Sequence, residues 1–365
     1  MGLPSIDGPQ AALFSDGIEE RTRGMQGAVC GPPKGPRRRR TAWGWLRIMR
    51  SMSAREVILL GTSSQVPTRA RGHNALFLRW DDLGILFDPG EGTQRQMLLA
   101  GIAATQITHI AITHFHGDHC LGLAAMLQRI SLDRVPHPVH VLFPESGQVF
   151  FERLRYASIY REQANIVPCP LRYRQGTPER LQEVWSRDDV QLFIAPLDHR
   201  IDCVGYRLQE RDGRRMRPDL LREAGVFGPH VRELIDRGSI DVAGHTVKLE
   251  HVSEPRRGQV FSLVMDTRPC PGAADLAHGA DLLVCESTFL SSEAEEAHDY
   301  QHMTAAQAAT LARDAAARTL LLTHFSQRYT SLDGFVAEAS AIFPDVVVGP
   351  DFTRVPLPPR EEKSP

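Results

Sequence analysis

The chain has 365 residues, of which 42% are hydrophobic and 24% are charged. It is therefore long and apolar enough to bury a sizeable core without disulfides or a structural metal. No apolar run reaches the roughly 18 residues of a membrane-spanning helix, and the composition is neither that of a collagen-like fibre nor that of a wholly disordered chain. The formal net charge of −2 is unevenly distributed: residues 1–54 hold nine basic and four acidic residues, and the rest of the chain holds 33 and 40. Such an acidic body differs from the basic surface expected of a nucleic-acid-binding protein.

Residues 1–54 are expected to form a leader without a stable fold. They contain a Gly- and Pro-rich stretch at 31–36 and four consecutive arginines at 37–40, with no sustained apolar period. We interpret them as a solvated tail, or as the product of a start codon upstream of the true start at Met52, rather than as a nucleic-acid-binding arm. Four acidic residues in this segment argue against a mitochondrial transit peptide. Six scattered cysteines, with no C-x-x-C pair and no secretory signal peptide, are typical of reduced thiols in a cytoplasmic protein.

From Glu56 onward, short apolar runs alternate with longer amphipathic stretches. The apolar runs predict buried strands at 57–60, 75–78, 85–87, 107–112, 139–143, 190–195, 260–265, 282–285, 319–322 and 346–348. The amphipathic stretches predict helices at 120–130, 146–156, 304–317 and 332–342. Many strands with fewer interspersed helices are typical of a layered α/β protein, here two sheets flanked by helices. The domain is expected to span residues 55–355, followed by a tail at 356–365.

The most informative pattern is Thr113-His114-Phe115-His116-Gly117-Asp118-His119, which directly follows the predicted strand at 107–112. In extended backbone, residues i and i+2 point to one side, so His114 and His116 can bind one cation. Gly117 permits a tight turn, after which Asp118 and His119 can face a neighbouring cation. Three imidazoles and a carboxylate at this spacing suit zinc and differ from a chance group of exposed histidines.

One loop cannot complete the ligand shells of two cations, so distant ligands are expected. His199, Asp266 and His324 each lie at or just beyond the end of a predicted strand. Any one of them could be a structural polar residue, but their shared placement is what a metal site on one rim of a sandwich requires. Asp266 is the natural bridge, because a carboxylate can bind two cations with its two oxygens. Two adjacent cations activate water and polarise a phosphoryl or acyl centre, so the sequence predicts a hydrolase and leaves its substrate open.

The order His114-x-His116-x-Asp118-His119, His199, Asp266 and His324 resembles the metallo-β-lactamase superfamily, which has a four-layer αββα sandwich and a dinuclear zinc site. Further motifs are similar to those of the ribonuclease Z family, whose members remove the 3′ trailer from precursor tRNA. These motifs are Leu60-Gly61-Thr62 with Pro67 and Asn74, Asp88-Pro89-Gly90-Glu91-Gly92-Thr93-Gln94, Leu197-x-His199 before Gly205-Tyr206, Asp266-Thr267-Arg268-Pro269, Glu286-x-Thr288-Phe289, His302-x-Thr304-Ala305-Ala306-Gln307 and Thr323-His324-Phe325-Ser326-x-Arg328-Tyr329. The resemblance runs from about residue 56 to 355.

The resemblance implies a role for each matching residue. His114, His116 and His199 are expected to bind the first zinc ion, and Asp118, His119 and His324 the second, with Asp266 shared. Asp118 is also expected to act as proton acceptor, and Glu286 and His302 to relay a proton toward the leaving 3′ oxygen. The implied cofactors are two Zn²⁺ ions per subunit, with Mn²⁺ or another divalent ion as an alternative.

Residues 207–240 interrupt the strand pattern, because they are polar, rich in arginine and punctuated by glycine and proline. Taken alone, they predict an ordinary solvated loop. Within the resemblance they match a protruding arm that grips tRNA, with the candidate RNA-binding residues Arg207, Arg211, Arg214, Arg215, Arg217, Gly228 and Pro229. Arginine suits this role because its planar fork of donors fits phosphate oxygens. The arm so delimited is short and contains no lysine.

The implied function is therefore a cytoplasmic endoribonuclease that acts on precursor tRNA as a homodimer, leaves a 3′-hydroxyl, and has no membrane or evident protein partner. The alternatives are another hydrolase on the same fold, acting on a thioester, a lactam or a different phosphodiester, and a catalytically silent RNA-binding protein. The chain departs from the family pattern at Cys285, where histidine is frequent, at Met303, where serine is frequent, and at Pro89, where cysteine is frequent. None of these departures is at a predicted metal ligand.

Overall fold

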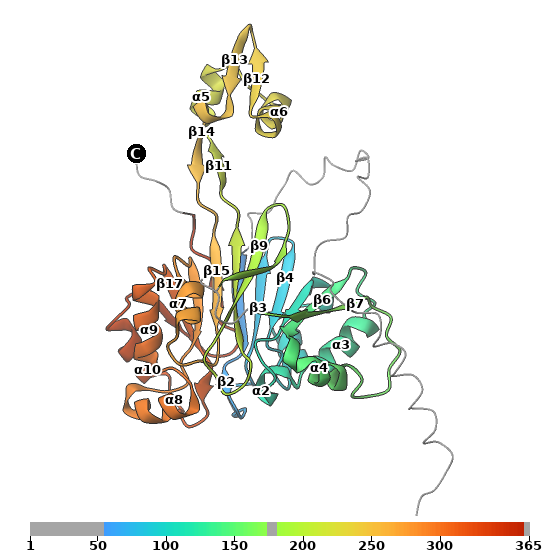
Figure 1. The fold of residues 1–365 in the computed structure, drawn as a ribbon, viewed down its shortest axis with the longest axis vertical. Helices are drawn as coiled ribbons and strands as arrows, with labels where there is room; N and C mark the ends of the chain where they lie inside the picture. The colour runs from blue at the N-terminus through green and yellow to red at the C-terminus, as the bar shows by residue number, and fades with distance from the viewer. Residues whose placement is uncertain (1–54, 174–180, 361–365) are drawn as a thin grey trace, which may run out of the picture.

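The computed structural model describes residues 55–173 and 181–360. Their centre is a pair of seven-stranded sheets that face each other, with helices on both outer faces (Figure 1). The predicted four-layer αββα sandwich is thus confirmed. The leader at 1–54, with its start at Met52, and residues 361–365 of the tail lie outside the described residues.

The first sheet contains, in spatial order, β20 (Arg354–Pro356), β1 (Arg55–Gly61), β3 (Ala75–Trp80), β4 (Leu83–Phe87), β5 (His109–Ala111), β6 (Val139–Pro144) and β7 (Ile166–Leu171). The second sheet contains β19 (Val346–Val348), β17 (Thr319–Thr323), β16 (Leu282–Glu286), β15 (Val260–Val264), β10 (Val204–Glu210), β9 (Val190–Pro196) and β8 (Gln182–Ser186). The helices of the body are α1 (Thr93–Leu99), α2 (Gly117–Cys120), α3 (Leu123–Leu132), α4 (Gln148–Arg155), α7 (Pro271–Ala277), α8 (Ala294–Tyr300), α9 (Ala305–Asp314) and α10 (Asp333–Ser340). Two short strands, β2 (Ser63–Ser64) and β18 (Phe325–Ser326), pair with each other.

Three hydrophobic cores hold the layers together. The central core lies between the sheets, where Leu59 and Phe87 of the first sheet meet Phe261 of the second. The second core joins the first sheet to α3 and α4, and the third joins the second sheet to α7, α9 and α10. Residues of one strand alternate between cores, as Leu59 and Leu60 of β1 do, because successive side chains of a strand point to opposite faces.

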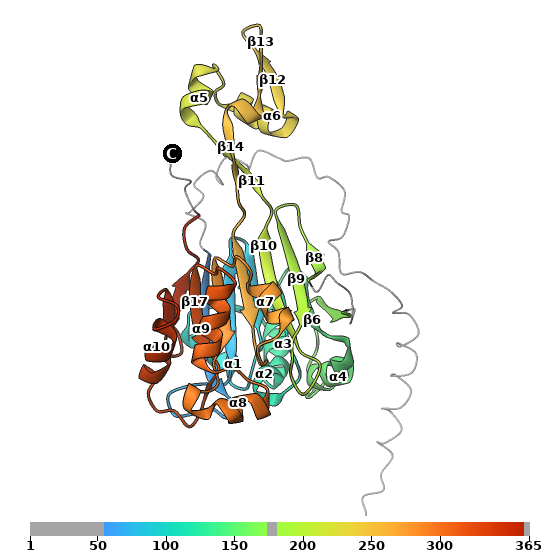
Figure 2. The ribbon, with the colours of Figure 1, turned by 60° about the vertical axis from the view of Figure 1, so that its left-hand side comes forward.

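A slender arm projects from one end of the sandwich (Figures 1 and 2). Its legs are β11 (Gly213–Met216) and β14 (Ser253–Arg256), which pair antiparallel, and its tip holds α5 (Pro218–Glu223), α6 (Pro229–Arg237), β12 (Ser239–Val242) and β13 (His245–Lys248). A fourth, small core formed by Leu221, Val226, Leu234, Ile240 and Val252 holds the tip together.

The structure corrects the expected bounds of this insertion at both ends. Residues 207–210 belong to β10 in the body, and the arm continues beyond residue 240 to Arg256. The arm therefore does contain a lysine, Lys248 on β13. Of the described residues, none forms a helix both long and apolar enough to cross a membrane.

Candidate metal centre and RNA-binding surface

The predicted metal ligands come together at one edge of the sandwich. His114, His116, Asp118 and His119 follow β5, while His199, Asp266 and His324 follow β9, β15 and β17. β4–β7 are mutually parallel, as are β15, β16, β17 and β19. The carboxyl ends of the parallel strands in each sheet therefore share one edge, and the loops leaving them converge there.

The first set of ligands is His114, His116, His199 and Asp266, whose ligand atoms all lie within 4.8 Å of one another. His116 Nδ1 is 3.0 Å from His114 Nε2 and 3.2 Å from His199 Nε2. Asp266 Oδ2 lies 3.6 Å from His114 Nε2. Burial and the nearby His119 hold the pKa of His114 well below its usual value, so its imidazole is neutral, as a metal ligand must be.

The second set is Asp118, His119 and His324. His119 Nε2 and His324 Nε2 are 3.1 Å apart, and each lies 3.5 Å from Asp118 Oδ2. The two oxygens of Asp266 face both sets, because Oδ1 lies 3.3 Å from His324 and Oδ2 lies 3.9 Å from His199. This placement is the one expected of a shared carboxylate.

Hydrogen bonds on the far side of the rings decide which nitrogen carries the proton. Thr113 Oγ1 donates its one hydrogen to Asp88, so it must accept from His114 Nδ1 at 2.9 Å. By the same logic, Thr288 Oγ1 donates to Glu286 and accepts from His324 Nδ1 at 3.0 Å.

Two more ligand rings, those of His119 and His199, also have a hydrogen-bond acceptor at Nδ1, on the side away from the site. His119 Nδ1 donates to the Asp88 carboxylate at 2.9 Å, and His199 Nδ1 donates to the Gln301 carbonyl at 3.3 Å. In the neutral form of all four rings the proton therefore sits on the outer nitrogen, and the inner Nε2 carries a lone pair that a cation can bind. Such outer partners are characteristic of metal-ligating histidines.

A bound cation accounts for the short distances between the Nε2 atoms that face into the site better than hydrogen bonds between neutral rings do. Neutral imidazole nitrogens that both carry lone pairs repel each other, yet His119 Nε2 and His324 Nε2 are only 3.1 Å apart. Tetrahedral zinc with Zn–N bonds of about 2.0–2.1 Å places two ligand nitrogens about 3.3 Å apart. The buried Asp266 Oδ1 also has no hydrogen-bond donor. The donor set thus fits two adjacent divalent cations of the zinc type, with three nitrogens and one oxygen in one set and two nitrogens and two oxygens in the other.

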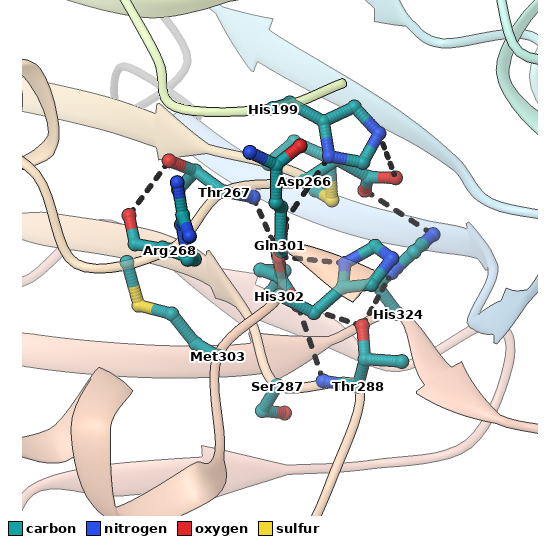
Figure 3. Close-up of polar contacts among 12 residues, drawn as sticks. His199, Asp266, Thr267, Arg268, Ser287, Thr288, Gln301, His302, Met303 and His324 are labelled. Carbon is teal, nitrogen blue, oxygen red and sulfur yellow. Dashed lines mark hydrogen bonds and ion pairs between the residues drawn. The ribbon is translucent and has the colours of Figure 1, made fainter. Parts of the chain in front are cut away.

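The predicted relay pair, Glu286 and His302, is also brought together beside this centre, and Figure 3 shows His302 next to His324. His302 Nδ1 donates to Glu286 Oε1 at 2.9 Å, and the His302 ring lies 5.5 Å from the ring of His324. Burial alone would lower the pKa of His302, but Glu286 and Asp266 outweigh it and raise the pKa to about 9. Glu286 also accepts from the backbone N–H of Thr267 at 2.7 Å, so it fixes the loop that carries Asp266.

The backbone around the centre is strained. Asp88, Asp266 and His324 have φ values of 45°, 38° and 63°, in the left-handed region that residues with a side chain rarely adopt. Each lies just beyond a strand end, where a left-handed turn redirects the chain. Non-glycine residues keep this conformation when the surrounding contacts fix it, and they are concentrated at functional sites.

Several residues that orient the ligands were not predicted from the sequence. Asp88 was recognised as part of a motif without a role, and the structure places it between Thr113 and His119. Thr113 and Thr288 were likewise given no role. In the sequence, each of them is a short polar residue that either precedes a histidine ligand or follows the strand that pairs with the ligand's own strand. That position is the signal by which they could have been found.

The candidate RNA-binding residues do not form one surface. Arg207 lies on β10, where its buried guanidinium donates to the carbonyls of Leu276 and His278, so it cannot contact RNA from the arm. Arg214 donates to Ser253, and Arg217 pairs with Asp219 and Glu254. Arg211, Arg214 and Arg215 are exposed residues.

The tip of the arm adds cations that were not predicted. A shallow hollow of 470 Å³ is lined by Arg214, Arg237, Lys248 and Glu250. Gly228 and Pro229 open α6 at the end of the helix opposite Arg237, with Pro229 in the first turn, where a missing N–H costs nothing. The hollow brings three basic side chains from different elements into one concave surface.

Comparison with known proteins assigns the family. A family model described as the metallo-β-lactamase superfamily matches residues 68–262. A ribonuclease Z of Nocardia farcinica is 53% identical over 310 residues, which are 85% of this chain and all of the relative. A ribonuclease Z of Chlamydia pneumoniae is 45% identical over 307 residues, which are 84% of this chain and 98% of the relative. The crystal structure of the short form of human tRNase Z covers 83% of this chain and 99% of its own, with a TM-score of 0.61 and 26% identity. The chain therefore belongs to the ribonuclease Z family of the metallo-β-lactamase superfamily.

Proposed function

We propose that this chain is a cytoplasmic endoribonuclease that cleaves precursor tRNA after the discriminator nucleotide and leaves a 3′-hydroxyl on the tRNA. The observation that carries the proposal is the pair of ligand sets sharing Asp266, in a chain that matches relatives named ribonuclease Z over almost their whole length. We further propose that two Zn²⁺ ions occupy these sets.

Different residues of the centre are suited to different steps of hydrolysis. When bound, two divalent cations polarise a phosphodiester and lower the pKa of a nearby water. Asp118 is suited to accept the proton of that water, because its Oδ2 lies 3.5 Å from both His119 Nε2 and His324 Nε2, the two nitrogens that would hold the second cation. His302 is suited to give a proton to the leaving 3′ oxygen, because Glu286 keeps it protonated at neutral pH.

The position of the arm supports a homodimer. β10 begins beside the metal centre, where the Val204 N–H donates to the Thr113 carbonyl, and ends at Glu210, where the arm leaves the body. Seven residues of strand span roughly 20 Å, and the arm extends further in the same direction (Figure 2). RNA gripped by the arm is therefore held away from the metal centre of its own subunit. We propose that it is presented to the centre of a second subunit.

Local charge resolves the conflict between an RNA substrate and an acidic body. Asp118 and Asp266 are part of that acidity, and two dications would more than cancel their charge. We propose that RNA meets positive charge locally, at these cations and at Arg214, Arg237 and Lys248 of the hollow at the arm tip, so the net charge of the chain says little about its substrate.

The deciding experiment incubates purified protein with a precursor tRNA that carries a 3′ trailer, and separately with a thioester, each with and without a chelator. The expected result is one chelator-sensitive cut that releases mature-length tRNA with a 3′-hydroxyl, which a ligase or poly(A) polymerase can then extend. Hydrolysis of the thioester alone would establish a different hydrolase on this fold. Tight binding of tRNA without turnover would establish an RNA-binding protein.

A further inference from the structure

An exposed aromatic ring with an arginine above it lies next to the metal centre. Tyr300 is the last residue of α8, and 43% of it is exposed. The guanidinium carbon of Arg200 lies 5.0 Å from the centre of the tyrosine ring. Arg200 Nη2 donates to the Asp299 carbonyl at 2.9 Å, and this hydrogen bond holds the guanidinium over the ring.

A second ring supports the first. Phe289 is buried, and its ring lies 6.4 Å from that of Tyr300, with only 18° between the planes. Arg328 covers Phe289 at 5.0 Å from the ring centre. Tyr300 therefore rests against a fixed apolar neighbour, and its exposed part is held in one orientation rather than swinging freely.

The loop that carries Tyr300 also carries parts of the metal centre. Gln301 ends α8 in a left-handed conformation with φ of 60°, and its carbonyl accepts the hydrogen bond of His199 Nδ1. His302 follows at once, and its ring lies 6.2 Å from that of Phe289. From the other side, Arg200 directly follows His199 in the chain. The ring and the guanidinium are thus fixed by residues adjacent to metal ligands (Figure 3 shows this loop at Gln301 and His302).

We propose that Tyr300 and Arg200 form a stacking platform for an unpaired nucleobase of the RNA, next to the phosphodiester that is cleaved. This inference rests on the proposed function. Proteins recognise unstacked bases by placing them on aromatic rings and on arginine planes. An arginine has five N–H donors; among the described residues the bond to Asp299 uses one of them, which leaves others for a phosphate of the same nucleotide. Because Arg200 already lies over the tyrosine ring, the base is expected to stack on the outer side of the guanidinium, which the ring supports from beneath, so the tyrosine hydroxyl is not required.

The charges at this rim are mixed, because arginines lie beside acidic residues of α8 such as Glu296 and Asp299, and the arginines are the groups that a phosphate would meet. Arg268 lies on the same side and is held by the carboxylate of Asp198, while His298 Nε2 lies 3.4 Å from Arg268 Nη1. Single-stranded RNA supplies both features that the platform recognises, a flat base and a flanking phosphate. The base could come from the discriminator side of the cut or from the trailer side, and the test separates the two.

The test combines base removal in the substrate with ring removal in the protein. Precursor tRNAs with an abasic nucleotide immediately before or immediately after the cut are compared with the intact substrate. For the wild-type protein, removal of the stacked base is expected to lower kcat/KM by about 5- to 150-fold, the range of base–aromatic stacking. The position at which the loss occurs identifies the side of the cut.

The Tyr300→Ala variant is expected to cleave the intact substrate more slowly by a similar factor and to show no further loss on the abasic one. Tyr300→Phe should retain the response of the wild type, because it keeps the ring face. Tyr300→Leu, which keeps apolar bulk against Phe289, should behave like Tyr300→Ala and separates loss of stacking from loss of folding. Tyr156→Ala is the matched control, since Tyr156 is an exposed tyrosine at the end of α4 with the guanidinium of Arg155 5.6 Å from its ring centre.

The inference is overturned if the abasic substrates lose the same factor with the wild-type protein and with both Tyr300→Ala and Tyr300→Leu. It is equally overturned if the wild-type protein cleaves all three substrates at one rate. A wild-type protein that cleaves no precursor tRNA at all would instead refute the proposed function, and this inference with it.

Discussion

The root of the arm is held by one carboxylate, and its removal gives a sharp prediction. Glu210 is the last residue of β10, and its side chain is 10% exposed. Arg55 of β1 donates to it at 2.9 Å, Arg256 of the arm leg β14 at 3.0 Å, and Arg360 near the end of the described chain at 2.9 Å. The backbone N–H of Gln259 adds a fourth bond at 3.1 Å. Glu210→Gln keeps the shape of the side chain and removes the charge that these groups share.

The cost of this change can be worked out bond by bond. Removing one partner of a buried ion pair costs about 3–5 kcal/mol; Arg55 is buried but keeps Asp81 at 2.6 Å, so its share is lower, about 2 kcal/mol. Arg256 and Arg360 are each about one third exposed, and such pairs contribute about 0.5 kcal/mol each. The expected loss is therefore about 3 kcal/mol. At about 2 °C per kcal/mol for a chain of this size, Tm should fall by about 6 °C.

The assay is thermal unfolding of Glu210→Gln, with Asp189→Asn as the matched control. Asp189 also accepts from an arginine, Arg187, but its side chain is 54% exposed, so its loss should lower Tm by less than about 2 °C. Burial raises the pKa of Glu210, but Arg55, the Gln259 N–H and Arg360 outweigh it and hold the pKa below the ordinary value. Its contribution is therefore present above the ordinary glutamate pKa and is lost as pH falls through the lowered one, and the gap in Tm between wild type and variant should close in that acidic range. Equal Tm values for the two variants at neutral pH would refute this account of the arm root.

Three further outcomes are expected. Asp118→Ala should lower kcat for precursor tRNA by about 10²- to 10⁴-fold while RNA binding persists in a filter-binding assay; loss of binding with unchanged kcat would contradict the role of proton acceptor. Changing Arg214, Arg215 and Arg217 together to alanine should weaken RNA binding and reduce the slope of log affinity against log salt by about 2, since each phosphate contact contributes roughly 0.7–0.9; an unchanged slope would show that these arginines do not meet phosphate. Chelation should lower Tm by about 5 °C, because a ligand at 100-fold its Kd contributes about 2.7 kcal/mol; a Tm that does not respond, with metal removal verified by elemental analysis, would mean that the inner nitrogens are stable without a cation.

The strands and helices that build the sandwich were largely predictable. All ten predicted strands and all four predicted helical stretches are found, because each carries the apolar run or periodicity of a buried element. β7 was missed since Pro168 and Pro170 interrupt it, and proline is tolerated there because β7 is the edge strand of its sheet. β10 was missed since Arg207 and Gln209 resemble the polar insertion that follows. Arg207 is buried nevertheless, because the carbonyls of Leu276 and His278 at the end of α7 satisfy its guanidinium.

The metal ligands could be predicted from the sequence, whereas the residues that hydrogen-bond to them could not. A metal ligand must be one of a few residue types and must follow a strand whose end faces the site, so His199, Asp266 and His324 stand out even though they are distant in sequence. Supporting residues such as Asp88 and Thr288 have no such restriction, since many side chains can accept a hydrogen bond. Their roles depend on which strands are neighbours, and that information is in the sheet order rather than in any local pattern.

Two departures from the family pattern have a joint explanation that appears only in three dimensions. Cys285 Sγ lies 3.9 Å from Met303 Sδ, and both residues are fully buried. They precede and follow the relay pair, Glu286 and His302, and so they form the layer beneath it. Burial raises the pKa of Cys285 well above its usual value, so the thiol stays neutral. The contact between Cys285 and Met303 therefore joins two weakly polar, polarisable side chains. A histidine at position 285 facing Met303, or a serine at position 303 facing Cys285, would bury a polar group without a strong partner, at a cost of about 1–3 kcal/mol. Because the two side chains are in contact, a change at either position alters the packing of the other, and in this chain the hydrogen bond between Glu286 and His302 is intact.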